Sequence, residues 1–264
     1  MGTRRLRLDA LLAERGLFQS RSRAAASVLA GEVRIGGEGA RAEKPGQLVA
    51  EDVVLSLDEA PAYVSRGGIK LANALDRLGI EVTGADALDV GASTGGFTDC
   101  LLQRGAARVA AVDVAYGQID WRLRSDSRVT VSDRVNARAL TPAMLPFAPG
   151  LIVIDVSFIS LEKVLPAVLA CAADRFDCLA MVKPQFEVGR ERVGKGGVVR
   201  DAALRREALA SVAGCATGLG ASVRGLASSG LPGPKGNRET FLWLAEGSRG
   251  GLEDLDSAIA EVEP

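Results

Sequence analysis

The stretch Ala-Leu-Asp-Val-Gly-Ala-Ser-Thr-Gly-Gly-Phe at residues 87–97 decides the fold. A short apolar run ends there in an acid, Asp89, and a glycine-rich turn, and a helical pattern follows. The next apolar run, residues 107–112, ends at a second acid, Asp113. This order is typical of a nucleotide-type cofactor site at the carboxyl edge of a parallel sheet, where glycines admit the ligand and the second acid takes ribose hydroxyls.

The turn itself indicates which cofactor to expect. It reads Gly91-Ala-Ser-Thr-Gly95-Gly96 and lacks the middle glycine of the dinucleotide fingerprint Gly-x-Gly-x-x-Gly. An acid two residues before Gly91 suits S-adenosylmethionine (SAM), because the ammonium of its methionine part can pair with the Asp89 carboxylate. For an isolated turn of this kind, a strand-turn-helix corner that binds no ligand is the alternative interpretation.

Composition excludes several classes of protein. The chain has 264 residues, of which 47% are hydrophobic, enough for one good-sized domain and a small one. We find no apolar run long enough for a membrane span and no signal peptide. The absence of histidine removes Ser-His-Asp and Cys-His hydrolases and His-metal sites. The cysteines stand singly, so we expect a cytoplasmic protein with buried thiols at Cys100, Cys171, Cys178 and Cys215.

Charge is unevenly distributed although the net charge is only −1. Residues 1–35 contain seven Arg and three acids, whereas residues 246–264 contain six acids and one Arg. A basic end of this kind favours a polyanionic partner, although solvated helix faces could also explain single arginines. The pattern predicts helices over residues 6–15 and 22–30, the second capped by Ser20, then strands over residues 33–35 and 52–57. We therefore predict a small α+β module over residues 1–58 and a linker over 59–63.

The remaining residues, 64–264, predict an α/β domain with a mostly parallel, Rossmann-like sheet of seven strands. Strands are expected at 86–90, 108–112, 128–132, 151–154, 178–182, 222–227 and 239–244, and the pattern allows either direction for the last of them. Helices are expected at 69–78, 96–104, 117–124, 161–172 and 202–217. Charged residues lie at or directly after the carboxyl ends of five of these strands, namely Asp89, Asp113, Asp133, Asp155 and Lys183. The carboxyl ends of parallel strands share one edge, so these side chains should meet there.

At this point the residues resemble a known family, the TlyA family of S4-domain rRNA 2′-O-methyltransferases, also described as haemolysins. The N-terminal match is to an RNA-binding S4 module and includes Arg-Leu-Asp at 7–9. The C-terminal match is more specific, since five blocks occur in order. They are Val-Ser-Arg-Gly-Gly-Ile-Lys-Leu at 64–71, Asp-Val-Gly-Ala-Ser-Thr-Gly-Gly-Phe-Thr at 89–98, Asp-Val-Ser-Phe-Ile-Ser-Leu at 155–161, Val-Lys-Pro-Gln-Phe-Glu-Val-Gly at 182–189 and Pro-Gly-Pro-Lys-Gly-Asn-Arg-Glu at 232–239.

The resemblance implies a catalytic core like that of FtsJ-type ribose methyltransferases, with the tetrad Lys70, Asp155, Lys183 and Glu239. A ribose hydroxyl is a poor nucleophile, and in a chain without histidine a lysine is the natural group to take its proton. Lys183 is the candidate base, and the two carboxylates would orient the two amines. The implied substrate is cytidine in ribosomal RNA within the ribosomal subunits. Residues 4–7 and the tail after Gly250 favour the type that modifies both subunits.

The expected ligand contacts follow from the same resemblance and from strand-end positions. For SAM they are Asp89, Gly91, Ala92, Ser93, Thr94, Gly95, Gly96, Asp113, Asp133 and Asn136, with Asp113 on the ribose and the last two near the adenine. For RNA they are Arg5, Arg7, Ser20, Arg21, Arg23 and Lys44. No metal is expected, since methyl transfer from a sulfonium develops no charge that a metal must neutralise. With 4% aromatic residues, shape recognition of structured RNA fits better than base stacking.

Four alternative functions fit the sequence less well. A haemolysin that acts on membranes needs an insertion segment or a secretion signal, and we find neither. A nicotinamide oxidoreductase needs the missing glycine. A pseudouridine synthase shares the S4 module and an Arg-Leu-Asp motif, but Asp9 fits better as an acid in the first turn of a helix. A non-catalytic RNA-binding factor need not retain all four tetrad positions. The linker departs from the family, with Pro61-Ala-Tyr63 where Arg-x-Trp is usual.

Overall fold

The computed structural model describes residues 4–29, 31–36, 39–57, 62–233 and 235–264. The chain divides into two compact units, Met1–Pro61 and Ala62–Pro264, and each is described here by itself. This division falls within the predicted linker 59–63, of which residues 59–61 lie outside the described residues. The N-terminal unit contains the basic end of the sequence, and the C-terminal unit contains the glycine-rich turn.

The N-terminal unit is a small α+β module with two short antiparallel pairs. Strand β1 (Arg5–Arg7) pairs with β3 (Leu48–Ala50), and β2 (Val33–Ile35) pairs with β4 (Leu55–Leu57). Helices α1 (Leu8–Glu14) and α2 (Arg21–Leu29) contribute Leu8, Leu12 and Val28 to the core. The predicted helix over residues 6–15 begins later, because Leu6 pairs with Val49 in a strand that the sequence did not reveal. The predicted strand 52–57 is likewise shorter.

In the described part of the C-terminal unit, seven strands form one sheet, which confirms the predicted α/β fold. The order is β10-β11-β9-β8-β5-β6-β7, parallel except that β11 runs antiparallel to both β9 and β10. The strands are β5 (Asp86–Val90), β6 (Arg108–Asp113), β7 (Val129–Asp133), β8 (Leu151–Ile154), β9 (Asp177–Val182), β10 (Ala221–Ser228) and β11 (Thr240–Glu246). The order reverses between β5 and β8, and at such a switch point loops diverge and leave room for a ligand.

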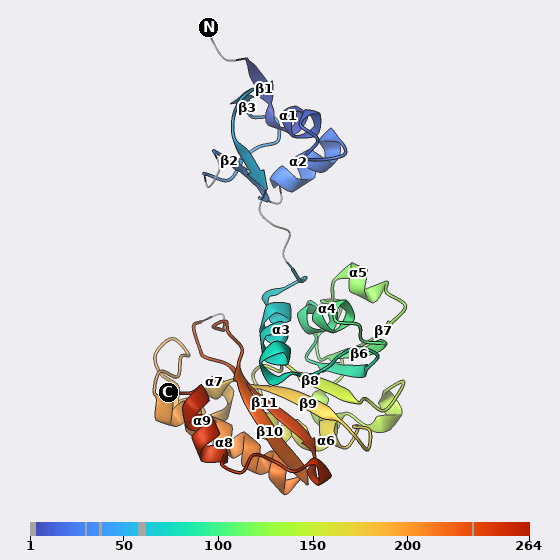
Figure 1. Ribbon diagram of the computed structural model, residues 1–264, viewed down its shortest axis with the longest axis vertical. Coiled ribbons are helices and arrows are strands. Elements are labelled where there is room, and N and C mark those ends of the chain that lie inside the picture. Colours follow the sequence, from blue (N-terminus) through green and yellow to red (C-terminus); the bar gives the residue numbers. More distant parts are fainter. Residues whose placement is uncertain (1–3, 30, 37–38, 58–61, 234) are drawn as a thin grey trace. The chain divides into compact units, whose positions relative to one another are not determined.

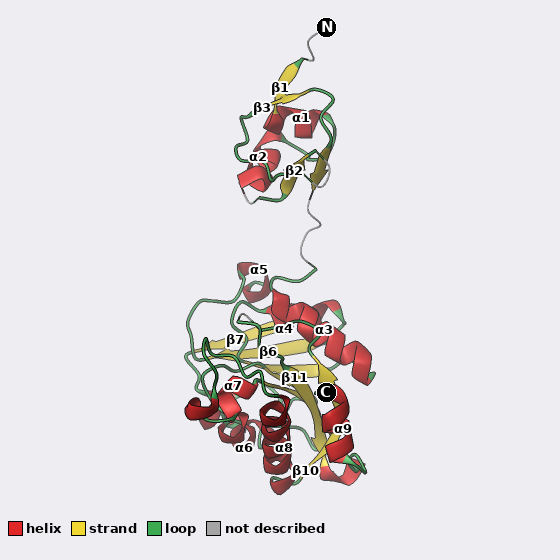
Figure 2. Ribbon diagram, turned by 90° about the vertical axis from the view of Figure 1, so that its left-hand side faces the viewer, coloured by secondary structure: helices red, strands yellow, loops and turns green. Residues whose placement is uncertain are grey.

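Helices cover both faces of the sheet (Figures 1 and 2). On one face, α3 (Arg66–Leu78) and α4 (Gly96–Gln103) pack in a cluster that includes Leu75, Leu101 and Phe241. On the other, α6 (Leu165–Leu169) and α8 (Ala202–Gly218) pack in a cluster that includes Ile152 and Val212. The strands buried between these layers are nearly continuous apolar runs, as expected for a parallel sheet covered on both sides.

Two predicted helices are shorter than expected. The segment 117–124 is helical only over α5 (Trp121–Arg124), because Gly117 has φ 68° and Asp120 caps the helix by accepting from the Arg122 N–H. The segment 161–172 breaks into a 3₁₀ turn and α6, which has Pro166 in its first turn. Two further helices were not predicted, α7 (Pro184–Glu187) and α9 (Leu255–Val262). Across the described ranges, no helix is both long and apolar enough to span a bilayer.

Candidate active site

The glycine-rich turn between β5 and α4 contains left-handed backbone conformations, and atoms packed against it leave no room for side chains at two of its glycines. Gly91 and Gly95 have φ values of 85° and 96°, and Ser93 is left-handed at 49° although it is not glycine. A Cβ on Gly91 would lie 2.4 Å from the Asp155 carbonyl oxygen, and one on Gly95 would lie 2.3 Å from Leu123. The glycines are therefore already required by packing within the protein, in addition to the approach of a ligand that the sequence suggested.

Asp113 fixes the conformation of this turn. Its two carboxylate oxygens accept hydrogen bonds of 2.7 Å from the backbone N–H groups of Ser93 and Ala115. Each oxygen keeps a further lone pair, so the carboxylate can still accept from a ribose hydroxyl. The two residues expected near the adenine are already engaged. Asp133 pairs with Arg124 at 2.8 Å, and the Asn136 side chain caps a 3₁₀ turn by accepting from Arg138 N–H.

Asp89 lies at the end of β5 and is completely buried. Its Oδ2 accepts a 2.6 Å hydrogen bond from the Thr98 hydroxyl, whereas its Oδ1 has no partner within the described structure. Burial raises the pKa of this carboxyl to about 7, with a smaller contribution from the negative charge of Asp155. A buried oxygen that lacks a donor, next to a glycine-rich turn, is the feature that the ammonium of SAM would satisfy. The residues present therefore fit this cofactor.

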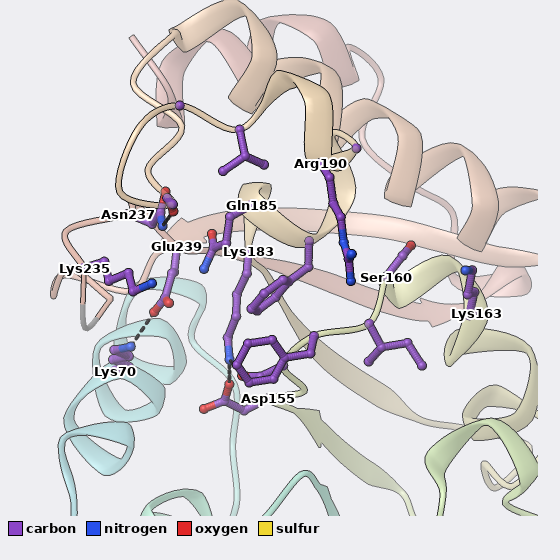
Figure 3. Close-up of a pocket in the computed structure, with 18 of the residues that line it drawn as sticks. Lys70, Asp155, Ser160, Lys163, Lys183, Gln185, Arg190, Lys235, Asn237 and Glu239 are labelled. Carbon is purple, nitrogen blue, oxygen red and sulfur yellow. Dashed lines mark hydrogen bonds and ion pairs between the residues drawn. The ribbon is translucent and has the colours of Figure 1, made fainter.

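The four tetrad residues come together as two ion pairs (Figure 3). Lys70 pairs with Glu239, and both side chains are almost fully buried. Lys183 pairs with Asp155 at 2.5 Å and also donates to the Ser157 hydroxyl at 2.9 Å. Two buried cations are thus neutralised by two carboxylates at the carboxyl edge of the sheet. Buried charges are costly unless paired in this way, so these positions are not ordinary surface residues.

Each tetrad side chain reaches the site from a different element. Asp155 directly follows β8. Lys183 directly follows β9 and is the N-cap residue of α7, which begins at Pro184. Glu239 directly precedes β11, which is antiparallel, so it reaches the same edge from the opposite chain direction. Lys70 lies on the buried face of α3. The sequence patterns that predicted the strands therefore also predicted two of these positions, Asp155 and Lys183, and the resemblance added Lys70 and Glu239.

An open cavity of about 1030 Å³ lies against the tetrad, and all four residues line it. Its described lining contains six cationic side chains and two acidic ones, Asp155 and Glu239. Four of the cations form no ion pair with an acidic side chain among the described residues, and they are Arg138, Lys163, Arg190 and Lys235. A cavity with this excess of positive charge suits a ligand with several phosphates. The sequence patterns did not predict these four cations, because they come from loops and turns without a strand-end signal.

An exposed aromatic pair also lines the cavity and was not predicted. Phe158 is 92% exposed and has a left-handed φ of 63°, and its ring lies 5.2 Å from that of Phe186 at an interplanar angle of 49°. An aromatic ring held in a strained conformation and open to solvent offers a face on which a base can stack. The sequence favoured shape recognition over base stacking because aromatic residues are few, and this ring adds a candidate stacking surface that composition did not indicate.

In the N-terminal unit, the predicted RNA contacts lie on the surface. Arg7 pairs with the buried Asp9 at 2.8 Å, and Arg21 lies 3.4 Å from the same carboxylate. The Arg7 hydrogen bond is the main reason why the pKa of Asp9 lies below its usual value. Asp9 is in the first turn of α1, as expected. The Ser20 hydroxyl accepts from the Arg23 N–H at 3.3 Å and so caps α2, and the exposed side chains are those of Arg5, Arg7, Arg21, Arg23 and Lys44.

Comparison with known proteins places these features in a family. Residues 63–246 match the FtsJ-like methyltransferase family, and residues 6–55 match the S4 domain. Over 98% of both chains, the sequence is 50% identical to the 16S/23S rRNA (cytidine-2′-O)-methyltransferase TlyA of Mycobacterium tuberculosis. It is 33% identical to the 23S rRNA (cytidine-2′-O)-methyltransferase TlyA of Campylobacter jejuni, over 76% of this chain and 80% of the relative.

The chain is also similar to a solved structure from Streptococcus thermophilus that is named a hemolysin. The match covers 99% of this chain and 95% of the solved one. The TM-score is 0.75 and the sequence identity is 40%. The two domain matches and the full-length relative agree with the motifs in the sequence. The chain therefore belongs to the TlyA family of FtsJ-like methyltransferases with an S4 domain.

Proposed function

We propose that this chain is a SAM-dependent methyltransferase that modifies the 2′-oxygen of cytidine in ribosomal RNA. The observation that supports it best is that two buried lysines form ion pairs, Lys70–Glu239 and Lys183–Asp155, on the wall of one cationic cavity. The relatives from Mycobacterium tuberculosis and Campylobacter jejuni, which are 50% and 33% identical to the chain, are named as rRNA (cytidine-2′-O)-methyltransferases. A non-catalytic RNA-binding protein would not need two paired cations buried at the sheet edge.

Lys183 is the proposed base. Once Lys183 has released its own proton to solvent, the neutral amine would accept the proton of the ribose 2′-hydroxyl while that oxygen attacks the methyl group; the methyl–sulfur bond would break and leave a neutral thioether. Asp155 and Ser157 hold the amine in place, and the carboxylate stabilises the ammonium that results. SAM supplies an electrophilic methyl group on a sulfonium. Correct placement of the hydroxyl accounts for much of the expected rate, so Lys70 and Glu239 would contribute through geometry as well as charge.

The cofactor would lie along the glycine-rich turn. Asp89 would take the methionine ammonium on its unpartnered Oδ1, and residues 91–96 would surround the methionine part. Asp113 would accept from the ribose hydroxyls with its remaining lone pairs, while Asp133 and Asn136 would lie near the adenine. This arrangement leaves the cavity on the other side of the tetrad free for the nucleic acid. No step of the proposed chemistry uses a metal ion.

The cavity and the S4 domain would share recognition of the RNA. Arg138, Lys163, Arg190 and Lys235 would contact phosphates near the target nucleotide, and the exposed face of Phe158 would stack on a base. Arg5, Arg7, Arg21 and Arg23 would contact phosphates of a folded rRNA helix and thereby position the enzyme. We further propose that the enzyme methylates rRNA of both the small and the large ribosomal subunit. Substrates of this kind imply a cytoplasmic protein.

Transfer of labelled methyl groups from SAM to unmodified small and large ribosomal subunits tests the proposal. The wild type should label at least one subunit, and Lys183→Ala should not. Lys195→Ala is the matched control. Lys195 follows Lys183 in the same segment between β9 and α8, it is exposed, and it is not among the residues that line the cavity. Absence of label on subunits and on free rRNA, in a protein that binds SAM, would refute the rRNA substrate. Equal activity of Lys183→Ala would refute the base.

A further inference from the structure

We propose that Glu263, near the end of the described chain, is a positioning residue for the catalytic carboxylate Glu239. This inference rests on the proposed function. Glu263 directly follows α9 and its side chain is 4% exposed, unlike the rest of the acidic tail. In the sequence this region stands out only by its six acids and one Arg over residues 246–264. Full burial of a carboxylate requires partners, and two of the three side-chain partners of Glu263, Arg238 and Thr240, flank Glu239 in sequence.

The contacts of Glu263 join three segments. Its Oε1 accepts a 2.9 Å hydrogen bond from the hydroxyl of Thr240, and its Oε2 accepts one of 2.6 Å from Nε of Arg205 on α8. The Oε2 atom also lies 3.9 Å from a guanidinium nitrogen of Arg238. Thr240 and Arg205 are themselves buried. A single carboxylate therefore touches the residues on both sides of Glu239 and fixes them to a helix.

The two faces of the sheet explain how this could affect catalysis. Side chains alternate along an extended strand, so consecutive residues point to opposite faces. Glu239 pairs with Lys70 of α3 on one face, whereas Thr240 faces α8 and α9 on the other. The backbone at the start of β11 is thus held from both sides. If Glu263 released Thr240, the side chain of Glu239 would still be held by the Lys70 ion pair and its backbone by the Ser229 N–H, but the support from the opposite face of the sheet would be lost.

The same arrangement reaches the wall of the substrate cavity. Arg205 donates a 2.6 Å hydrogen bond to the Arg200 carbonyl, and nearby the Asn237 side chain accepts from Val199 N–H at 2.9 Å and donates to the Gly197 carbonyl at 2.8 Å. Residues 197–200 and 237–240 are therefore tied together next to the tetrad. The Glu263 contacts form the outer support of this junction, away from any atom that would react.

The other end of β11 supplies a matched control. There Asp177 forms a 2.7 Å ion pair with Arg249 and accepts a 2.7 Å hydrogen bond from the Trp243 ring nitrogen. Both sets of contacts anchor the same strand through one carboxylate. A strand of seven residues spans roughly 20 Å, so the Asp177 contacts lie far from Glu239. Loss of either anchor should lower stability, but only loss of the Glu263 contacts should displace Glu239.

The experiment compares Glu263→Gln, Thr240→Val, Thr240→Ser and Asp177→Asn in the full chain, with methyl transfer to ribosomal subunits as the assay. We expect kcat to fall about 10- to 100-fold in Glu263→Gln and Thr240→Val, with KM for SAM unchanged. Thr240→Ser keeps the hydroxyl and should retain the wild-type kcat, and Asp177→Asn should do so as well. Because Thr240→Val is nearly isosteric, it tests the inference even if Glu263→Gln fails to fold.

Hydrogen exchange separates this inference from the proposed function. Backbone amides of residues 238–241 should exchange faster in Thr240→Val and remain protected in Asp177→Asn, a result that needs no methyl acceptor. Unchanged kcat and unchanged exchange in folded Thr240→Val would overturn the inference. An equal loss of kcat in Asp177→Asn would also overturn it, by showing a general effect of stability. An inactive wild type would count against the proposed function alone.

Discussion

Binding of SAM should become tighter as the pH rises through 7, because Asp89 must be ionised to pair with an ammonium. Burial raises the pKa of this carboxyl to about 7, well above the ordinary value of an aspartate. Its Oδ1 lacks a partner among the described residues, and its side-chain donor is the Thr98 hydroxyl on Oδ2. Below pH 7 the carboxyl is mostly protonated and neutral, so the electrostatic part of cofactor binding is lost.

The size of the effect follows from the ionised fraction. With a pKa of about 7, roughly a tenth of Asp89 is ionised at pH 6 and about three quarters at pH 7.5. If only the ionised form binds the cofactor, Kd should fall about eightfold over this interval. In Asp89→Asn the group does not titrate, so Kd should be weaker and nearly independent of pH in the same range.

Isothermal titration calorimetry with SAM at pH 6.0, 6.5, 7.0 and 7.5 measures this dependence. Asp126→Asn is a suitable control, because the Arg128 hydrogen bond lowers the pKa of Asp126 to about 2 and the group stays ionised throughout. A flat Kd in the wild type would refute the reasoning. A pH dependence that persists unchanged in Asp89→Asn would assign the titration to another group.

Three further outcomes are expected. Lys70→Ala leaves the buried Glu239 carboxylate unpaired and should lower the free energy of unfolding by about 3–5 kcal/mol in urea titrations, and a loss below about 1 kcal/mol would contradict burial of the pair. Phe158→Leu keeps an apolar side chain but removes the aromatic face, so it should weaken binding of ribosomal subunits by about 1–3 kcal/mol and leave SAM binding unchanged. Trp121→Leu is the control, because Trp121 is also exposed but does not line the cavity, and it should have no effect on either binding. Since the folded-state pKa of Asp89 is raised, its ionisation costs stability as pH rises from about 4 to 7, so Tm should fall more steeply from pH 5 to 8 in the wild type than in Asp89→Asn.

The sequence predicted the sheet well because the sheet is buried on both faces. The central strands β8 and β9 and the neighbouring β6 are mainly apolar, and five strands have a charged residue at or directly after their carboxyl ends. From the sequence alone, these charges located Asp89, Asp113, Asp155 and Lys183. Which charge pairs with which could not be predicted, since that depends on how α3 and β11 are placed next to β8 and β9.

The features that were missed depend on contacts between distant parts of the chain. Glu263 has the appearance of a solvated acid in the sequence, yet it is buried because Arg205 and Thr240 lie next to it in space. Phe158 is one of a few aromatic residues in the chain, and nothing in its sequence context indicates the left-handed backbone and the high exposure that the structure shows. Strand β1 is three residues long and is stabilised by pairing with β3, so local propensity gave no signal for it.

Identification of the methylated nucleoside is the most direct test of the proposed activity. Ribosomal subunits that lack the modification are incubated with the protein and SAM, and the rRNA is digested to nucleosides and analysed by mass spectrometry. We expect 2′-O-methylcytidine with the wild type and with Lys195→Ala, and none with Lys183→Ala. A methyl group on a base, on another nucleoside, or on no rRNA at all would contradict the proposal.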